Sequence, residues 1–270
     1  MFTISRKTVK TAVIAWQYAR MTYAKWIQYP LNFWLDVGLR FVEAGLFFLF
    51  WGVLLGNKLN VGNWTMQGFL LIYFFEVLFI WCMVCFSFAA TYSWEKIVSG
   101  DIDKFLVRPT IPWAMIALEE INPNIGAFFV AAAALVAAVA SGAQISLPIL
   151  LVGLIMCFLA GIIAFLFGLT IACLSFWFGR VDELTRLFEG FWEFEYYPSN
   201  LFPWQVQTII AFTLPFVFAH TIPTLALLGQ ISLQSLAQFF LAELAVIGIW
   251  FLVFQFVWRR GLKRYESYGG

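Results

Sequence analysis

The chain has 270 residues and a net charge of +1; 63% of its residues are apolar and only 11% are charged, and its mean hydropathy is +0.87. Soluble domains are about 45–50% apolar and about 25% charged. A water-soluble fold of this size cannot bury so much apolar surface, whereas lipid can cover it, and the low net charge gives no reason to expect nucleic acid as a partner. The composition therefore predicts a polytopic membrane protein built mostly of helices and surrounded by membrane lipid.

Residues 1–29 carry several basic side chains but no continuous apolar core of the kind found in a cleavable signal peptide. Apolar residues recur on one helical face, at Val9, Val13, Trp16, Tyr23 and Ile27. This pattern predicts an amphipathic interfacial helix that lies on the membrane surface before the first span. The alternative is a disordered basic tail.

A helix needs about 20 apolar residues to cross about 30 Å of hydrocarbon. Six stretches are candidates for spans: 31–55, 67–93, 125–140, 148–178, 205–228 and 237–258. The fifth is ambiguous because Pro215 and Pro223 interrupt it. It is either a kinked span or a re-entrant hairpin, and in the second case 182–201 crosses the membrane instead.

The basic residues predict the orientation, because cytoplasmic loops are rich in lysine and arginine. All of them except Arg40 and Lys58 fall in four clusters, at 6–25, 96–108, 180–186 and 259–264. Six spans with a cytoplasmic N-terminus place all four clusters inside. Both termini are therefore expected in the cytoplasm, whichever stretch is the fifth span.

The cytoplasmic loop 94–112 contains enough apolar residues for a short amphipathic helix. Ile97, Val98, Ile102, Phe105 and Leu106 can share one face of that helix, which ends before Pro109. Such a helix is suited to docking into an apolar groove of another protein. The alternative is a solvated turn.

Charged residues form two stripes at helical spacing, and further carboxyl groups lie inside the spans. The candidates for a polar pathway or a subunit interface are Asp36, Arg40, Glu43, Glu76, Arg186, Glu189, Glu193 and Glu243. Arg186 is expected to pair with Asp182 and Glu189, one turn away on either side. Arg40 is the candidate partner of Glu193. The alternative for the second stripe is a wet cytoplasmic helix.

The motifs of several enzyme classes do not occur in these 270 residues. There is no P-loop sequence and no Gly-x-Ser-x-Gly. The single histidine, His220, argues against a histidine metal site, and the four cysteines lie in apolar runs, where packing explains them better than redox chemistry. The chain is therefore not expected to be an enzyme or to bind a metal or cofactor. If it transports a substrate, the energy must come from ions or from a partner.

Four stretches of the sequence are similar to those of a known family. They are SGDIDKFLVRP at 99–109, LSFWFGR at 174–180, YPSNLFP at 197–203 with the later LP at 214–215 and IPTLALLG at 222–229, and GLKRYES at 261–267. In their order and spacing they resemble permease subunits of the type-2 ABC exporter family, in its branch of uncharacterised six-span permeases.

This resemblance implies an all-α permease domain over the whole chain, in the bacterial-type plasma (inner) membrane. It also implies a second permease, identical or different, and two cytoplasmic ATPase subunits that bind ATP and magnesium. The loop after the second span would be the coupling helix, formed by Gly100, Asp101, Ile102, Asp103, Lys104, Phe105 and Leu106 and closed by Arg108 and Pro109. A re-entrant hairpin at 205–229 would lie on the outer side before the last span, with its outer turn and breaks at Tyr197, Pro198, Phe202, Pro203, Pro215 and Pro223.

Span five would then be 182–201, which is unusually acidic for the family pattern. Three other classes stay open. An ion-coupled secondary transporter would use Glu76, Glu189 and Glu243 as proton carriers. The others are a membrane enzyme, for which no nucleophile–base pair is evident, and a non-transporting assembly subunit.

Overall fold

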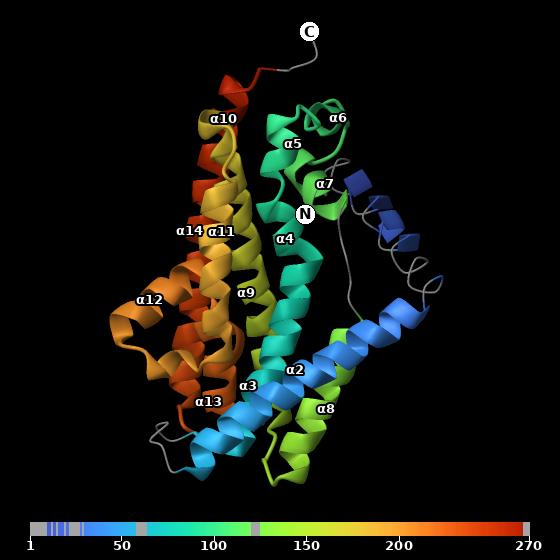
Figure 1. Cartoon of the computed structure of the whole chain (residues 1–270). Helices are drawn as coiled ribbons and strands as arrows, with labels where there is room; N and C mark the ends of the chain where they lie inside the picture. The colour runs from blue at the N-terminus through green and yellow to red at the C-terminus, as the bar shows by residue number, and fades with distance from the viewer. Residues whose placement is uncertain are drawn as a thin grey trace.

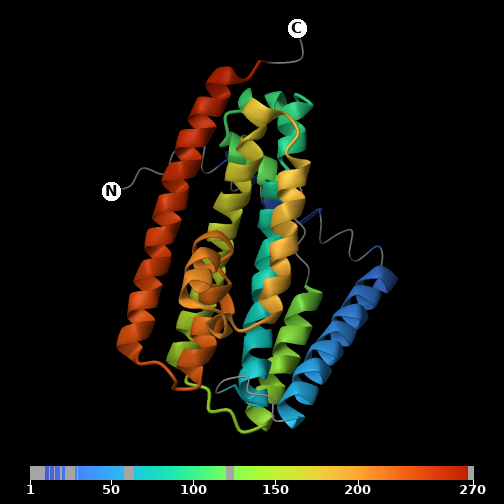
Figure 2. The ribbon, with the colours of Figure 1, turned by 60° about the vertical axis from the view of Figure 1, so that its left-hand side comes forward.

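The computed structural model describes residues 30–57, 64–119 and 125–266, together with scattered residues between 10 and 28. Within helices it leaves the side chains of residues 88, 89, 117–119, 188 and 191–193 undescribed. All regular elements in these ranges are helices, and they form one elongated bundle (Figures 1 and 2). The expected all-α class is therefore confirmed for the described part of the chain.

Four helices in the described ranges are long and apolar enough to cross a membrane. They are α2 (Pro30–Gly56), α3 (Met66–Cys82) with its continuation η1 (Met83–Ser87), α9 (Leu147–Cys173) with α10 (Ser175–Phe178), and α14 (Leu233–Arg264). A helix of 27 residues, such as α2, is about 40 Å long, which exceeds the hydrocarbon thickness of about 30 Å. The chain thus has the helices of a multi-pass membrane protein.

Two segments that the six-span prediction counts as spans do not meet these criteria. One is too short and the other is too charged. Helix α8 (Gly126–Ala140) has 15 residues, about 22 Å, and packs against α2 and α3. Helix α11 (Asp182–Gly190) continues into the 3₁₀ turns of η2 (Phe191–Tyr196), and its sequence is charged. By length and composition the structure therefore supports four spans, or five if the bent helix pair described below counts as one.

One end of the bundle gathers the short helices. These are α4 (Phe88–Thr91), α5 (Trp94–Val98), α6 (Asp103–Leu106) and α7 (Pro112–Glu119), and they lie near α10 and the C-terminal end of α14 (Figure 1). The expected interfacial helix at 1–29 lies mostly outside the described residues. Within that range, Thr11 Oγ1 accepts a hydrogen bond of 3.2 Å from the backbone N–H of Ile111, which ties the N-terminal segment to this end.

The segment from Val181 to Asn200 runs along the bundle from this end to the other. Val181 packs in one cluster with Trp94, at the start of α5. Asn200, in the short 3₁₀ helix η3 (Ser199–Leu201), accepts a hydrogen bond of 3.0 Å from the indole of Trp64, just before α3 begins. Because Trp64 and Trp94 flank the helical run α3–η1–α4 at opposite ends, this segment covers the same length of the bundle as that run.

After η3 the chain makes a broken helical pair. Helix α12 (Trp204–Thr213) is bent by 97° against the run of η4 (Val217–Thr221) and α13 (Ile222–Leu227). The break lies at Pro215, which has no N–H to continue the helical hydrogen bonds. The indole of Trp250, midway along α14, donates a hydrogen bond of 2.6 Å to the carbonyl of Phe212 and so holds the end of α12 against that helix.

Candidate functional site

The loop 94–112 has the short helices expected from its sequence, joined by a tight turn at Gly100. Gly100 has φ = 84°, a left-handed conformation that side chains rarely adopt, so glycine suits this position. The turn lets α6 fold back beside α5, and its carbonyl accepts a 3.4 Å hydrogen bond from the hydroxyl of Tyr265, beyond the end of α14. Burial, followed by its interactions with Asp103, raises the pKa of Tyr265 to about 12, so this hydroxyl stays protonated at neutral pH.

The apolar face of this loop points inward, which corrects one expectation. Ile102 and Phe105 are fully buried, and they belong to one cluster with Phe176, Phe254 and Trp258. Their side chains are therefore not available to dock into a partner protein. Their role in the structure is to fix α6 on α10 and α14, because burying large apolar side chains is what stabilises so short a helix.

The outward surface of the loop consists of other residues. Val107 is 83% exposed, and Val98, Asp101, Lys104, Arg108 and Pro109 are exposed as well. Gly100, Asp103 and Leu106 are half-buried between the two faces. We define the exposed six residues as the coupling surface. It is a mixed polar and apolar patch on a rigid support, rather than an apolar helix face.

The acidic stripe on α11 pairs only in part as expected. Arg186 makes ion pairs with Asp182 at 3.5 Å and with Glu183 at 3.4 Å, both at the start of the helix. Glu189 instead accepts a hydrogen bond from the hydroxyl of Tyr92, which follows α4. The expected pair Arg186–Asp182 is therefore confirmed, whereas the expected pair Arg186–Glu189 is wrong, since Arg186 pairs with Glu183 instead. This hydrogen bond, more than burial, raises the pKa of Tyr92 to about 12.

On α2 the structure shows one ion pair of Arg40 with a described residue. Arg40 Nε lies 3.3 Å from a carboxylate oxygen of Asp36, one turn earlier. The side chain of Glu193, its expected partner, is among those that the structure leaves undescribed, so that pairing stays a prediction. Glu43 forms no ion pair with any described residue.

Three carboxyl groups lie inside the bundle. Glu76 on α3 and Glu243 on α14 are fully buried, and neither has a hydrogen-bond partner among the described residues. Glu195 on η2 is 8% exposed and lies close enough to Glu76 and Glu43 for electrostatic interaction. Sequence reasoning selected Glu76 and Glu243 but not Glu195, which it did not separate from the other acids of the segment.

The residues predicted to form the outer turn pack against one another, against α2 and against η4. Tyr197 packs its ring 6.0 Å from that of Trp51, and Phe202 packs 5.4 Å from Phe194. The backbone N–H of Ser199 donates a 3.0 Å hydrogen bond to Thr221 Oγ1. Pro198, Pro215 and Pro223 are buried, whereas Pro203 is exposed. The turn is thus attached to the returning limb of the broken pair.

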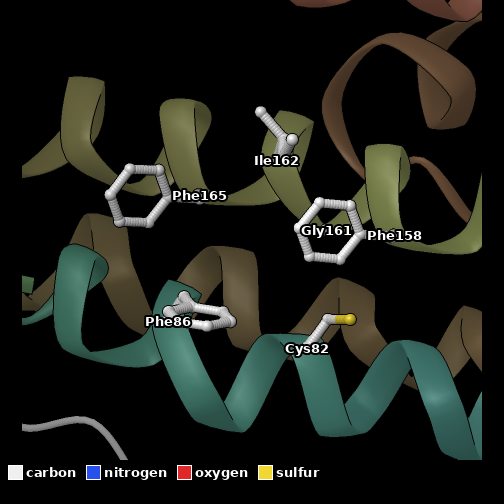
Figure 3. A pocket seen from close by; sticks show the side chains of 6 residues that line it. All are labelled: Cys82, Phe86, Phe158, Gly161, Ile162 and Phe165. Carbon is white, nitrogen blue, oxygen red and sulfur yellow. The ribbon is translucent and has the colours of Figure 1, made fainter. Parts of the chain in front are cut away.

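A separate cavity of about 190 Å³ lies between α3–η1 and α9 (Figure 3). Six residues line it: Cys82, Phe86, Phe158, Gly161, Ile162 and Phe165. A side chain at 161 would collide with Cys82, since a Cβ there would come within 2.9 Å of the cysteine Cβ. The lining has no charged group, so this cavity offers space for apolar groups only. No group of three or more His, Cys, Asp or Glu in the described residues could hold a metal ion.

Comparison with known proteins gives a family but no near relative. No curated protein and no solved structure matched the chain. The model of one family, described as ABC-2 family transporter protein, matches residues 41–269. This range includes the coupling surface, the broken helix pair and all the helices after α2. The chain is therefore a multi-pass membrane protein that belongs to the ABC-2 transporter family.

Proposed function

We propose that this chain is the transmembrane permease subunit of an ATP-driven exporter, paired with a second permease and coupled to two cytoplasmic ATPase subunits. The observation that carries the proposal is the construction of the loop 94–112. Ile102 and Phe105 are fully buried and anchor it, while Val107 and Lys104 stay exposed. A rigid, exposed protrusion is what a partner needs in order to transmit a conformational change into the bundle.

The roles that we propose for the permease and its partner subunits follow from the absence of an ATP-binding motif in the sequence. These 270 residues contain no P-loop motif, so ATP and magnesium would bind to the partner subunits and the permease itself would catalyse no reaction. The family membership supports an association with ATPase components in general. The cluster around Phe176, Phe254 and Trp258 gives the coupling surface a mechanical connection to α9, α10 and α14.

The proposed topology has six spans: α2, α3–η1, α8, α9, the α11–η2 segment and α14. The broken pair α12–α13 would be a re-entrant hairpin over 205–229. The α11–η2 segment is about 25 Å long, which suffices for most of the hydrocarbon. Charged residues near its start would sit at the interface, and Glu195 would be covered by α3.

The proposed orientation puts the coupling surface and both termini in the cytoplasm of a bacterial-type inner membrane. The supporting observation is that α5, α6, α10 and the end of α14 lie at one end of the bundle (Figure 1). Their basic residues are therefore together, from Lys96 to Arg108 and from Arg259 to Arg264. The loops at the opposite end contain one lysine, Lys58, and no arginine. This asymmetry is typical of a cytoplasmic basic end.

The test is co-purification of an ATPase with the tagged permease from its native membrane in mild detergent. We expect a polypeptide with a P-loop sequence, and ATP hydrolysis that Val107→Asp reduces at least tenfold. Leu201→Asp is the matched control, because Leu201 is also exposed but lies in η3 at the opposite end of the bundle. If both variants give the same ATP hydrolysis, the coupling role is refuted. If no ATPase copurifies with the parent protein, the exporter function is refuted.

One observation favours a second candidate, an ion-coupled transporter. Glu76 and Glu243 are buried without hydrogen-bond partners among the described residues, as carboxyl groups in proton pathways are. Transport in reconstituted vesicles separates the two functions. A proton ionophore would abolish ion-coupled transport, whereas an ATP-driven exporter would continue as long as ATP is supplied to the ATPase side.

A further inference from the structure

A cavity of about 290 Å³ opens between α2 and the end of η2, away from the coupling surface. Its lining combines one carboxylate with five aromatic rings: Glu43, Phe47, Phe50, Trp51, Tyr196 and Tyr197. Aromatic faces carry partial negative charge and attract cations, most strongly when the site is shielded from water. A carboxylate surrounded by aromatic side chains is therefore a chemistry suited to organic cations.

Phe47 and Trp51, the two buried rings of the lining, are held in place by their packing. Trp51 stacks on Phe69 with 4.0 Å between ring centroids, which fixes the indole from behind. From the other sides it is met at steep angles by Phe50, at 5.2 Å, and Tyr197, at 6.0 Å. Because Trp51 is already packed, a ligand would meet a fixed indole face and would not have to order it.

The charges around the cavity favour a cation over an anion. Glu43 has no ion pair among the described residues, and the nearby Arg40 is bound to Asp36. Behind Glu43 lie Glu76 and Glu195, both near enough to interact with it electrostatically. The guanidinium of Arg40 is already paired with Asp36, so among the described residues no cation pairs with Glu43, and a bound cation could take that place.

We propose that this cavity binds an amphipathic organic cation, with its ammonium group beside Glu43 and the aromatic rings and its apolar body toward the bilayer. Such a group can come from a lipid headgroup that carries an ammonium or from a free hydrophobic cation. A role of this binding in export rests on the proposed function. The binding itself does not, and it is measured on the permease alone.

The test uses the full-length permease in nanodiscs of phosphatidylglycerol, with radiolabelled tetraphenylphosphonium as the probe and empty nanodiscs as background. We expect saturable binding of this cation. Tetraphenylborate, an anion of nearly the same shape, should neither bind nor compete. Glu43→Gln should weaken binding at least tenfold, Glu43→Asp should stay within about threefold of the parent, and Glu95→Gln, an exposed acid of α5, should leave it unchanged.

Added phosphatidylethanolamine distinguishes the two sources of the ligand. If it competes with the probe, the site takes a lipid ammonium; if it does not, the site takes a free cation. Absence of saturable binding, equal binding of tetraphenylborate, or unchanged affinity in a folded Glu43→Gln variant would overturn the proposal. A crosslink between the Leu46→Cys residues of two copies, in a dimer that does not bind the probe, would also overturn the proposal. Leu46 lies on the cavity wall, so the cavity would then belong to a permease interface.

Discussion

Gly261 of α14 lies directly against the ring of Phe176 in α10. A Cβ at position 261 would come within 2.1 Å of the ring. The nearest ring atoms are Cδ2, Cε2 and Cγ, the last being the atom through which the ring is attached. The ring also packs 6.0 Å from Trp258 and 5.9 Å from Tyr265, which leaves it little room to move. The absence of a side chain at 261 is thus what lets α14 approach the helices that support the coupling surface.

Gly261→Ala is therefore expected to lower the free energy of unfolding by about 1–3 kcal/mol, the usual cost of overpacking a core. Thermal unfolding in detergent, followed by tryptophan fluorescence, measures the change. Gly248→Ala on the same helix is the control, because a Cβ there would meet nothing within 4 Å. That variant should keep the parent stability or gain slightly, since alanine favours helix more than glycine does. Equal effects at both positions would contradict the close packing at 261.

Phe105→Ala should cost about 3–5 kcal/mol, as expected for a large side chain removed from a core. Val107→Ala, two residues away, should change stability by less than about 0.5 kcal/mol, because Val107 is 83% exposed. Both variants are measured by the same thermal unfolding. A small effect of Phe105→Ala would mean that its ring is not buried in the intact protein and is free to contact a partner after all.

Phe105 and Val107 also show which features of the loop can be predicted from the sequence. The apolar pattern of 94–112 predicted a short helical loop with one apolar face, and the structure has that loop. The sequence alone does not say whether this face meets the protein's own core or another protein, because the periodicity is the same in both cases. The answer depends on Phe176, Phe254 and Trp258, which are remote in sequence and meet the loop only in the folded bundle.

The carboxyl groups show a similar limit. Glu76 and Glu243 were identifiable because each interrupts a long apolar run. Glu195 was not, because it lies in a segment rich in acids whose backbone changes from α-helix to 3₁₀-helix at Phe191. That change alters the spacing of residues on a face from 3.6 to 3.0 per turn, so a helical projection places Glu195 incorrectly. The pairing of Glu189 with Tyr92 joins residues 97 positions apart, and no local pattern could reveal it.

The hydrogen bond between Tyr92 and Glu189 predicts a pH dependence. The pKa of Tyr92 is about 12 in the folded protein against 10 for an ordinary tyrosine, so the folded state holds the phenol proton more tightly. The resulting stabilisation is fully present below pH 10 and is lost as the pH rises through about 12. Tyr92→Phe should therefore cost about 0.5–1.5 kcal/mol at pH 7 to 9, and the difference from the parent protein should shrink above pH 10.

The measurement is the unfolding free energy of both proteins across this pH range. Comparing variant with parent cancels most of the contribution of other groups. A difference that stays constant to pH 12 would show that ionisation of Tyr92 is not linked to folding. No difference at neutral pH would show that the hydrogen bond contributes nothing to stability.

Both ends of the segment 201–228 lie beside the start of α3, which predicts the outcome of a labelling experiment. Asn200 is bonded to Trp64, and Leu228 approaches Gly68, where a Cβ would come within 3.2 Å of its methyl group. A single span over this segment would put its ends on opposite sides of the membrane, whereas a re-entrant hairpin puts both on the outer side. Gln205 and Gln230 are exposed near the two ends.

Cysteines introduced at Gln205 and at Gln230 should both react with a membrane-impermeant maleimide added to intact cells, while a cysteine at Lys104, on the coupling surface, should react only after the membrane is opened. Background labelling should be low, because the four native cysteines are free but buried. Reaction of only one of the two glutamine positions would make 204–227 a kinked span and would remove the α11–η2 segment from the count of spans. Outside labelling at Lys104 would reverse the orientation altogether, and the coupling surface would then face away from any cytoplasmic ATPase.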